Sequence, residues 1–271
     1  MENLKNIKNP KKIFEGGQKK VYKGTHPKYG EVVLKKGACG TNSSFKRIER
    51  EVYVLKNINS KYYPEHYEFI SDKTKKEFII IEEFISLSSL KKVKNEFTKE
   101  KDVILLLKHL IKGLSILWDQ NIIHRDIKPD NILIRNNYEP VIIDLGIARL
   151  LDYKDLTLTL ANQGPCTPVY AAPEQIRNNK DIIGIRTDFF LLGILIYELL
   201  LGFHPFKPSK INNKNTITDN ILNGNFYNLE NTDLSKSSKD LIKKLLNPKP
   251  YLRFRNKKLL IKYISKNWGD L

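Results

Sequence analysis

The chain has 271 residues, of which 41% are hydrophobic, and its 47 Lys and Arg against 30 Asp and Glu give a formal net charge of +17. This length and apolar content are typical of a globular protein with a substantial core and exclude an intrinsically disordered chain. Its two cysteines, Cys39 and Cys166, are too few for a disulfide framework or a cysteine-based metal site, which favours a cytoplasmic location.

The excess of positive charge has two interpretations: a basic surface for nucleic acid or anionic lipid, or a general bias towards lysine. Lys, Asn and Ile are abundant along the whole chain, so we favour the bias and expect no nucleic-acid partner. A basic protein would still favour acidic protein substrates. The most apolar run, residues 189–201, has 13 residues and includes Glu198, whereas a bilayer needs about 20. We therefore predict a buried helix there and no membrane span, and residues 1–12 have no apolar signal core.

The first predicted elements are two strands joined by a tight turn. Gly16 and Gly17 precede alternating apolar residues that include Val21, a pattern typical of a hairpin. The backbone N–H groups of a glycine turn can lie over phosphates without obstruction by side chains. An ordinary hairpin turn is the alternative that this stretch leaves open.

A third strand is predicted over residues 31–35, a β-rich run that ends in Lys35. A helix follows over residues 43–57, because a serine can cap it and apolar residues then recur every three or four positions. Glu51 lies on the flank of that apolar stripe, where an unpaired carboxylate would be costly, so we expect it to pair with Lys35. Glu49, which lies off the stripe, is the alternative partner.

Three further elements precede the polar segment 124–146, which we call the polar centre. Residues 78–85 predict a strand, and residues 86–90 predict a connector that opens a helix. Residues 101–120 place their apolar side chains on one broad face and so predict a long amphipathic helix.

The polar centre begins with His-Arg-Asp-Ile-Lys-Pro-Asp-Asn at residues 124–131 and ends with Asp-Leu-Gly at residues 144–146. Between these two loops, short apolar runs at 132–134 and 141–143 predict a hairpin. The hairpin would bring the side chains of Asp126, Asn131 and Asp144 close together. Carboxylate and amide oxygens gathered in this way suit Mg²⁺.

These two loops resemble the catalytic and metal-binding loops of eukaryotic-type protein kinases, in which His-Arg-Asp-x-Lys-x-x-Asn precedes Asp-x-Gly. Residues 13–22 resemble the glycine-rich loop of that family, although Phe14 and Lys19 stand where its first and third glycines are usual. The resemblance implies an α+β, bilobal fold in a single protein kinase domain, residues 1–271. Its β-rich N-lobe would span residues 1–85 and its larger helical C-lobe residues 86–271.

The resemblance also implies ATP and Mg²⁺ as cofactors, and it assigns roles to individual residues. Asp126 orients the substrate hydroxyl and accepts its proton, and Lys128 neutralises charge on the moving phosphoryl group. Lys35, held by Glu51, reaches the α- and β-phosphates. Asn131 and Asp144 hold Mg²⁺, and the other nucleotide contacts are Gly16, Gly17, Val21 and the hinge residues Glu83, Phe84 and Ile85.

The long segment that ends in Ala-Pro-Glu at residues 172–174 resembles an activation segment. In it, Thr167 matches the family threonine that contacts the catalytic Asp and Lys. Thr157 and Thr159 are candidates for a phosphorylation that docks on Arg125. Solvated loop threonines are the alternative for these two.

Three more positions match or depart from the family pattern. Asp188, at the start of the predicted apolar helix, matches the aspartate that braces the catalytic loop, and capping of that helix is its alternative role. Arg253 matches the arginine that pairs with the glutamate of Ala-Pro-Glu, here Glu174. Glu82 lies at the gate to the back of the nucleotide pocket, where a hydrophobic residue or threonine is usual.

We therefore predict a Mg·ATP-dependent protein serine/threonine kinase, because Lys128 resembles the loop of the Ser/Thr-specific enzymes. A pseudokinase scaffold, a small-molecule kinase and a nucleic-acid-binding module are the alternatives. The intact catalytic and metal-binding residues argue against the first, and the Ala-Pro-Glu segment with Thr167 argues against the second. The third predicts binding with a steep salt dependence.

Overall fold

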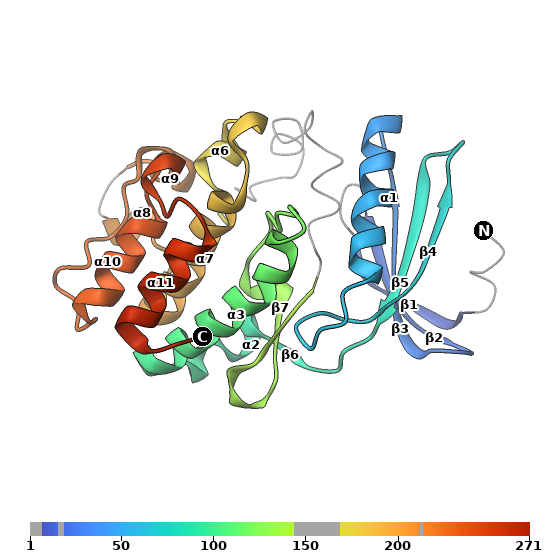
Figure 1. The fold of residues 1–271 in the computed structure, drawn as a ribbon, viewed down its shortest axis with the longest axis horizontal. Helices are drawn as coiled ribbons and strands as arrows, with labels where there is room; N and C mark the ends of the chain where they lie inside the picture. The colour runs from blue at the N-terminus through green and yellow to red at the C-terminus, as the bar shows by residue number, and fades with distance from the viewer. Residues whose placement is uncertain (1–6, 16–18, 144–168, 212–213) are drawn as a thin grey trace. The chain divides into compact units, whose positions relative to one another are not determined.

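The computed structural model of this chain describes residues 7–15, 19–143, 169–211 and 214–271. The described residues divide into two compact units, the first up to Leu87 and the second from Ser88 onwards. Figure 1 shows the elements of each unit in the colours of their place in the sequence.

The first unit is an antiparallel sheet of five strands in the order β1-β2-β3-β5-β4, with helix α1 beside it (Figure 1). The predicted hairpin, third strand, helix and hinge-side strand are all present. Strand β4 was not predicted, because the alternation of polar and apolar residues over 66–69 breaks at Ile70, which follows the apolar Phe69 directly. The elements are β1 (Lys8–Glu15), β2 (Lys19–His26), β3 (Gly30–Ala38), α1 (Asn42–Lys56), β4 (His66–Asp72) and β5 (Glu77–Glu83).

The two faces of this sheet differ in chemistry because successive side chains of a strand point to opposite faces. On one face, Val32, Leu34, Ile79 and Ile81 are at most 3% exposed and form a hydrophobic cluster. The residues between them in β3 and β5 point to the other face, which we call the lysine face. It carries Lys35.

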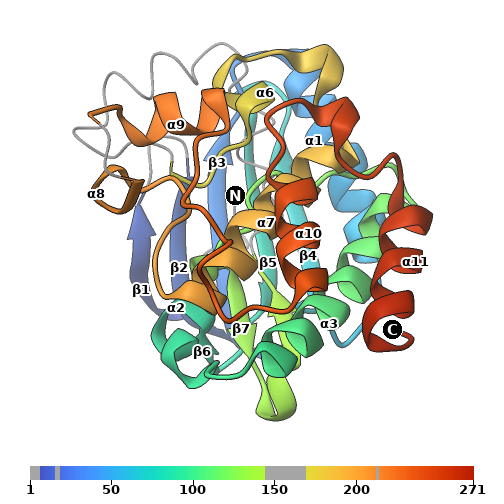
Figure 2. The same ribbon diagram turned by 90° about the vertical axis from the view of Figure 1, so that its left-hand side faces the viewer.

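The second unit is mostly helical (Figures 1 and 2) and includes a small antiparallel sheet in the order β6-β7-β8. The predicted hairpin of the polar centre is present as two of these strands, and the long amphipathic helix is α3. Its helices are α2 (Leu90–Val93), α3 (Glu100–Trp118), α6 (Pro173–Ile176), α7 (Ile185–Leu201), α8 (Pro208–Ile211), α9 (Ile217–Asn223), α10 (Lys236–Leu245) and α11 (Lys257–Trp268), and its strands are β6 (Ser88–Ser89), β7 (Ile132–Ile134) and β8 (Pro140–Ile142). Single 3-10 turns lie at Lys94–Glu96, Pro129–Asn131, Asn136–Tyr138, Lys180–Ile182 and Pro250–Leu252.

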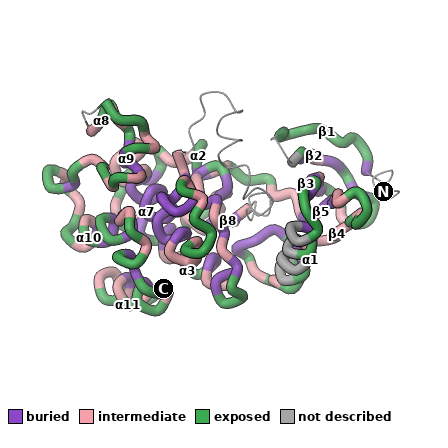
Figure 3. The backbone as a smooth tube through the Cα atoms, turned by 90° about the horizontal axis from the view of Figure 1, so that it is seen from above, coloured by how far each residue is buried: buried purple, intermediate pink, exposed green. Residues whose placement is uncertain are grey.

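Helix α7 is the centre of this unit, and 12 of its 17 residues are buried (Figure 3). It ends where predicted, because Gly202 takes a left-handed φ of 77° that a residue with a side chain rarely adopts. At Gly193 the helix meets α10 so closely that an added Cβ would lie 2.9 Å from Leu245 Cβ. The described helices include none long and apolar enough to cross a membrane.

One predicted detail of α7 is wrong. Asp188 was given helix capping as an alternative role, but the helix begins at Ile185 and its N-cap position is Gly184. Asp188 therefore lies inside the first turn, with a fully buried side chain whose oxygen atoms are available to another part of the chain.

Candidate active site

The loop that precedes β7 places three of the predicted catalytic side chains in contact. Lys128 Nζ donates to Asp126 Oδ2 at 2.9 Å. Asn131 Nδ2 donates to the same Oδ2 at 2.9 Å and to the backbone oxygen of Asp126, also at 2.9 Å. Asp126 and Asn131 are each 6% exposed. Two donors therefore hold a nearly buried carboxylate in one orientation, as a group that must meet an incoming hydroxyl requires.

The contacts of Asn131 also bear on its predicted metal role. Because its Nδ2 faces two acceptor oxygens of Asp126, the amide orientation is fixed and Oδ1 points elsewhere. An amide oxygen is a hard ligand of the kind Mg²⁺ prefers, so this residue fits its assigned role. The second predicted ligand, Asp144, lies outside the described residues, and the described part of the chain has no cluster of three or more His, Cys, Asp or Glu that could hold a metal.

The side chain of Asp188 binds the backbone of this loop. Its Oδ1 accepts from the Arg125 N–H at 2.8 Å, and its Oδ2 accepts from the His124 N–H at 3.0 Å and from Trp118 Nε1 at 2.8 Å. Burial raises the pKa of the Asp188 carboxyl, while His124 and these hydrogen bonds act in the opposite direction. The bracing role that the resemblance gave to Asp188 is confirmed by these contacts.

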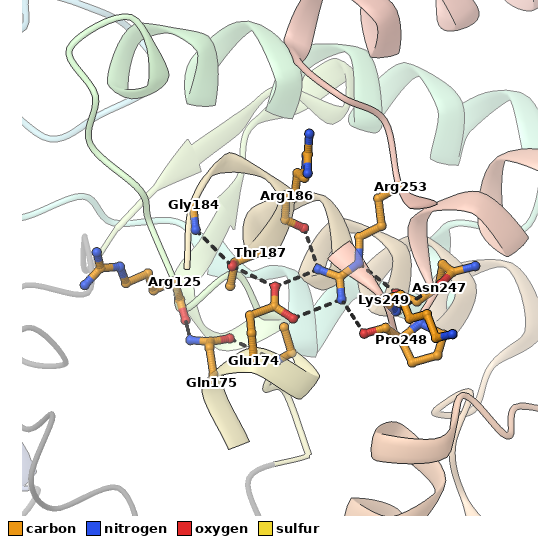
Figure 4. Close-up of polar contacts among 11 residues, drawn as sticks. Arg125, Glu174, Gln175, Gly184, Arg186, Thr187, Asn247, Pro248, Lys249 and Arg253 are labelled. Carbon is orange, nitrogen blue, oxygen red and sulfur yellow. Dashed lines mark hydrogen bonds and ion pairs between the residues drawn. The ribbon is translucent and has the colours of Figure 1, made fainter. Parts of the chain in front are cut away.

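The backbone of the loop is strained at Arg125, which has a φ of 65° although it carries a long side chain. Its N–H donates to Asp188, and its oxygen accepts from Gln175 Nε2 at 3.0 Å (Figure 4). Hydrogen bonds on both sides of the residue thus compensate for an unfavourable conformation. Neither Gln175 nor Trp118 was predicted from the sequence to take part.

The predicted pair of Glu174 and Arg253 is confirmed. Arg253 Nη1 lies 2.7 Å from Glu174 Oε1 and Nη2 lies 3.0 Å from Oε2, and both side chains are 0% exposed (Figure 4). The hydroxyl of Thr187 donates to Glu174 Oε1 at 2.8 Å. Helix α6 is thereby fixed to α7 and to the 3-10 turn before Arg253.

In the first unit, Lys35 has an observed partner that the sequence did not predict. Its Nζ forms an ion pair with Oε1 of Glu82 on the neighbouring strand β5. Glu51 belongs to α1, but its side chain lies outside the described part of the structure, so its predicted contact with Lys35 stays a prediction. Glu49, the alternative partner, pairs instead with Lys73 at 3.4 Å.

The predicted nucleotide contacts of the first unit lie around Lys35 and the end of β5. Val21 is 8% exposed and faces Lys35 directly across β2 and β3, so the two side chains share the lysine face. In the hinge, the Glu83 N–H donates to the Glu65 oxygen at 2.8 Å and the Phe84 N–H to the Glu31 oxygen at 3.3 Å. These two amides are therefore engaged within the chain, and of the three hinge residues Ile85 is left as the candidate amide donor to a ligand.

Several predicted residues lie outside the described ranges. They are Gly16 and Gly17 of the glycine turn, Asp144, and Thr157, Thr159, Cys166 and Thr167 of the segment before Ala-Pro-Glu.

The comparisons with known proteins agree with this fold and site. The family model for the protein kinase domain matches residues 7–263, and the chain therefore belongs to the protein kinase family. The fold is the bilobal kinase fold: a crystal structure of Rad53 1-466 in complex with AMP-PNP matches with a TM-score of 0.72 and 23% sequence identity, over 96% of this chain and 66% of that chain.

Curated relatives carry kinase names. Myosin light chain kinase A of Dictyostelium discoideum is 30% identical over 236 residues, which are 83% of this chain and 74% of that protein. A protein of the same organism described as a probable serine/threonine-protein kinase is 30% identical over 231 residues, 84% of this chain. The chain spans only 32% of the length of that relative. The protein named inactive serine/threonine-protein kinase PLK5, from Mus musculus, is 29% identical over 89% of this chain and 39% of its own length.

Proposed function

We propose that this chain is an active protein serine/threonine kinase, which transfers the γ-phosphoryl group of ATP to serine or threonine hydroxyls of a protein substrate. The observation that carries the proposal is the contact of Asp126 with both Lys128 and Asn131, at 2.9 Å each. Phosphoryl transfer needs three groups close together: a carboxylate, an ammonium group and an amide that can bind a metal ion.

Asp126 accepts a hydrogen bond from the substrate hydroxyl and takes its proton as the oxygen attacks the γ-phosphorus. The bond between that phosphorus and the oxygen of the β-phosphate breaks, and ADP leaves. The ammonium group of Lys128, hydrogen-bonded to Asp126 Oδ2, stabilises negative charge on the phosphoryl oxygens during transfer. Because the transition state is loose and its charge is spread over oxygen atoms, positioning and electrostatics supply most of the catalysis. Thr167 would contact both residues from the activation segment.

The nucleotide would lie against the lysine face. Lys35 reaches its α- and β-phosphates, Val21 packs on the base, and the Ile85 amide with the hinge carbonyls binds the adenine edge. Gly16 and Gly17 would lie over the phosphates. Asn131 and Asp144 would hold Mg²⁺, which would supply positive charge to neutralise the phosphate oxygens.

The kind of protein substrate is inferred from the kinase family and from the net charge of the chain. A net charge of +17 would attract acidic protein segments at low ionic strength. An acidic protein such as casein should therefore be phosphorylated faster than a basic one such as histone. The cytoplasmic location stays a prediction.

The proposal is tested by incubating the purified chain with γ-labelled ATP, Mg²⁺ and casein, and then identifying the labelled amino acids. We expect phosphoserine and phosphothreonine, on casein or on the chain itself, and no phosphotyrosine. The Asp126→Asn variant, purified in the same way, controls for a contaminating kinase. Label that never exceeds the level of that variant would refute the proposal.

A pseudokinase is the second candidate, and two observations favour it. Phe14 and Lys19 stand where the family usually has glycines, and one relative over most of the chain is named inactive. A pseudokinase that binds nucleotide would be stabilised by Mg·ATP in a thermal shift assay and would give no labelled amino acid in the transfer assay.

A further inference from the structure

The ion pair between Lys35 and Glu82 follows from the register of two adjacent strands. In the β3–β5 pairing, Lys35 lies directly across from Ile80, and Glu82 is two residues further along β5. The two charged residues are therefore diagonal neighbours on the lysine face, within reach of each other's long side chains. Their side chains are only 12% and 5% exposed, so the contact is screened by little water.

One other titratable side chain faces this carboxylate from strand β4. His66 lies directly across from Glu82, and its Nδ1 is 3.9 Å from Glu82 Oε2. Burial lowers the pKa of His66 and so favours its neutral ring. The cation that lies in an ion pair with Glu82 in the described part of the chain is Lys35.

We propose that Glu82 is a positioning residue, whose carboxylate holds the ammonium group of Lys35 in place for the nucleotide phosphates. This inference rests on the proposed kinase function. It gives Glu82 on β5 the same role that the family resemblance assigned to Glu51 on α1. Because a buried charge without a partner is costly, Glu82 keeps Lys35 ordered before the nucleotide arrives.

The chain contains a matched control pair on the same two strands. Lys36 lies across from Ile79, and Glu77 is its diagonal neighbour on β5. Lys36 Nζ is 4.0 Å from Glu77 Oε2, and these side chains are 41% and 33% exposed. Glu77→Gln thus removes a carboxylate from a neighbouring lysine on the opposite face, without touching the lysine face.

The first test needs no catalysis. Lys35 is acylated with a small amine-reactive reagent in the absence of nucleotide, and its rate of labelling is followed by mass spectrometry across pH 6–10. A neighbouring carboxylate raises the pKa of a lysine amine by about one to three. The charged amine does not react with the reagent. Glu82→Gln should therefore raise the labelling rate of Lys35 at pH 7 about tenfold or more, whereas Glu77→Gln leaves it unchanged.

The second test measures turnover. With casein as substrate, Glu82→Gln should reduce kcat/KM for Mg·ATP about 10- to 100-fold, and Glu82→Asp should recover part of that loss. Glu77→Gln should behave as the wild type. Glu51→Gln is run beside them: a loss in both Glu51→Gln and Glu82→Gln supports shared positioning, whereas a loss confined to Glu51→Gln overturns the inference.

A double-mutant cycle covers the case in which Glu82→Gln folds but is too unstable for kinetic work. Lys35→Gln and Glu82→Gln each break the buried ion pair, so the double variant should be more stable in urea than the sum of the two single losses predicts. Additive losses, or a Lys35 labelling rate and kcat/KM in Glu82→Gln equal to the wild type, would overturn the inference. If the wild type shows no phosphotransfer, the proposed function is contradicted. The inference about Glu82 is still tested in that case, because the acylation of Lys35 and the double-mutant cycle do not require turnover.

Discussion

Arg253 binds Glu174 through two parallel N–H···O contacts of 2.7 and 3.0 Å in a site from which water is excluded. The same guanidinium donates to the backbone oxygens of Arg186 and Asn247, both at 2.8 Å (Figure 4). It also stacks over the Phe190 ring, 4.6 Å from the ring centre. This residue therefore connects α6, the start of α7 and the turn that precedes α11. The connection fixes the position of the Ala-Pro-Glu end of the predicted activation segment.

Breaking this pair on one side should destabilise the second unit strongly. Glu174→Gln leaves the Arg253 charge buried without a compensating carboxylate, and we expect a loss of about 3–5 kcal/mol in the free energy of unfolding. Urea denaturation monitored by circular dichroism measures it. The control is Glu230→Gln, which breaks an exposed pair with Lys243 and should leave the midpoint unchanged. Equal midpoints for the two variants would contradict the role given to the buried pair.

Asp188→Asn should loosen the catalytic loop while the fold survives. The amide NH₂ of asparagine would face one of the N–H groups of His124, Arg125 or Trp118 that now donate to the carboxylate. We expect a loss of about 1–3 kcal/mol in stability, together with a fall in kcat, because Arg125 would no longer be held in its strained conformation. Trp118→Phe removes only one of these hydrogen bonds and should have the smaller effect on kcat. A kcat for Asp188→Asn equal to the wild type would rule out this bracing role.

The stability of the protein should fall as the pH drops below 6.5, because a buried histidine must take up a proton. His204 Nε2 donates to the Val169 oxygen at 2.9 Å, and its Nδ1 accepts from the Phe206 N–H at 3.3 Å. Burial lowers the pKa of His204 to about 4, against smaller opposing effects of the hydrogen bond to Val169 and of Glu198. The neutral ring therefore satisfies both neighbours, and the charged ring would lose the bond to Phe206.

The sign follows from the two pKa values. A histidine with a pKa of 6.5 in the unfolded chain and about 4 in the folded one stabilises the fold fully above pH 6.5. That contribution, about 3 kcal/mol, is lost as the pH falls towards 4. His66, whose pKa is also lowered by burial, adds to the effect in the same direction. Urea midpoints measured from pH 7.5 to 4.5 should decline less steeply in His204→Gln, and a parallel decline in that variant would contradict the assignment.

The sequence predicts those elements well in which local pattern and tertiary packing agree. The run 189–201 is apolar on every side and is the buried helix α7, and the β-branched runs on either side of residues 136–139 are the hairpin β7–β8. Helix α9 was missed within an asparagine-rich stretch, although Thr216 and Asp219 form a capping box at its start. That signal was present and could have located the helix.

Contacts between distant segments were predictable only where the family resemblance supplied them. It paired Arg253 with Glu174 and assigned Asp188 to the catalytic loop, whereas helix-capping rules alone misplaced Asp188 by four positions relative to the N-cap at Gly184. The predicted pair of Lys35 with Glu51 stays a prediction, because the side chain of Glu51 lies outside the described part of the structure. The ion pair of Lys35 with Glu82 depends on the β3–β5 register, which no single strand sequence determines.

The central claim is that Asp126 is the group through which this chain performs phosphoryl transfer. The most direct measurement is the rate of γ-phosphoryl transfer from saturating Mg·ATP to casein by the wild type and by Asp126→Asn. Asp119→Asn, which breaks an ion pair with Lys257 at the end of α3, serves as the control. We predict that Asp126→Asn lowers the rate about 10²- to 10⁴-fold with an unchanged nucleotide affinity, and that Asp119→Asn matches the wild type. Transfer by Asp126→Asn at the wild-type rate would contradict the account.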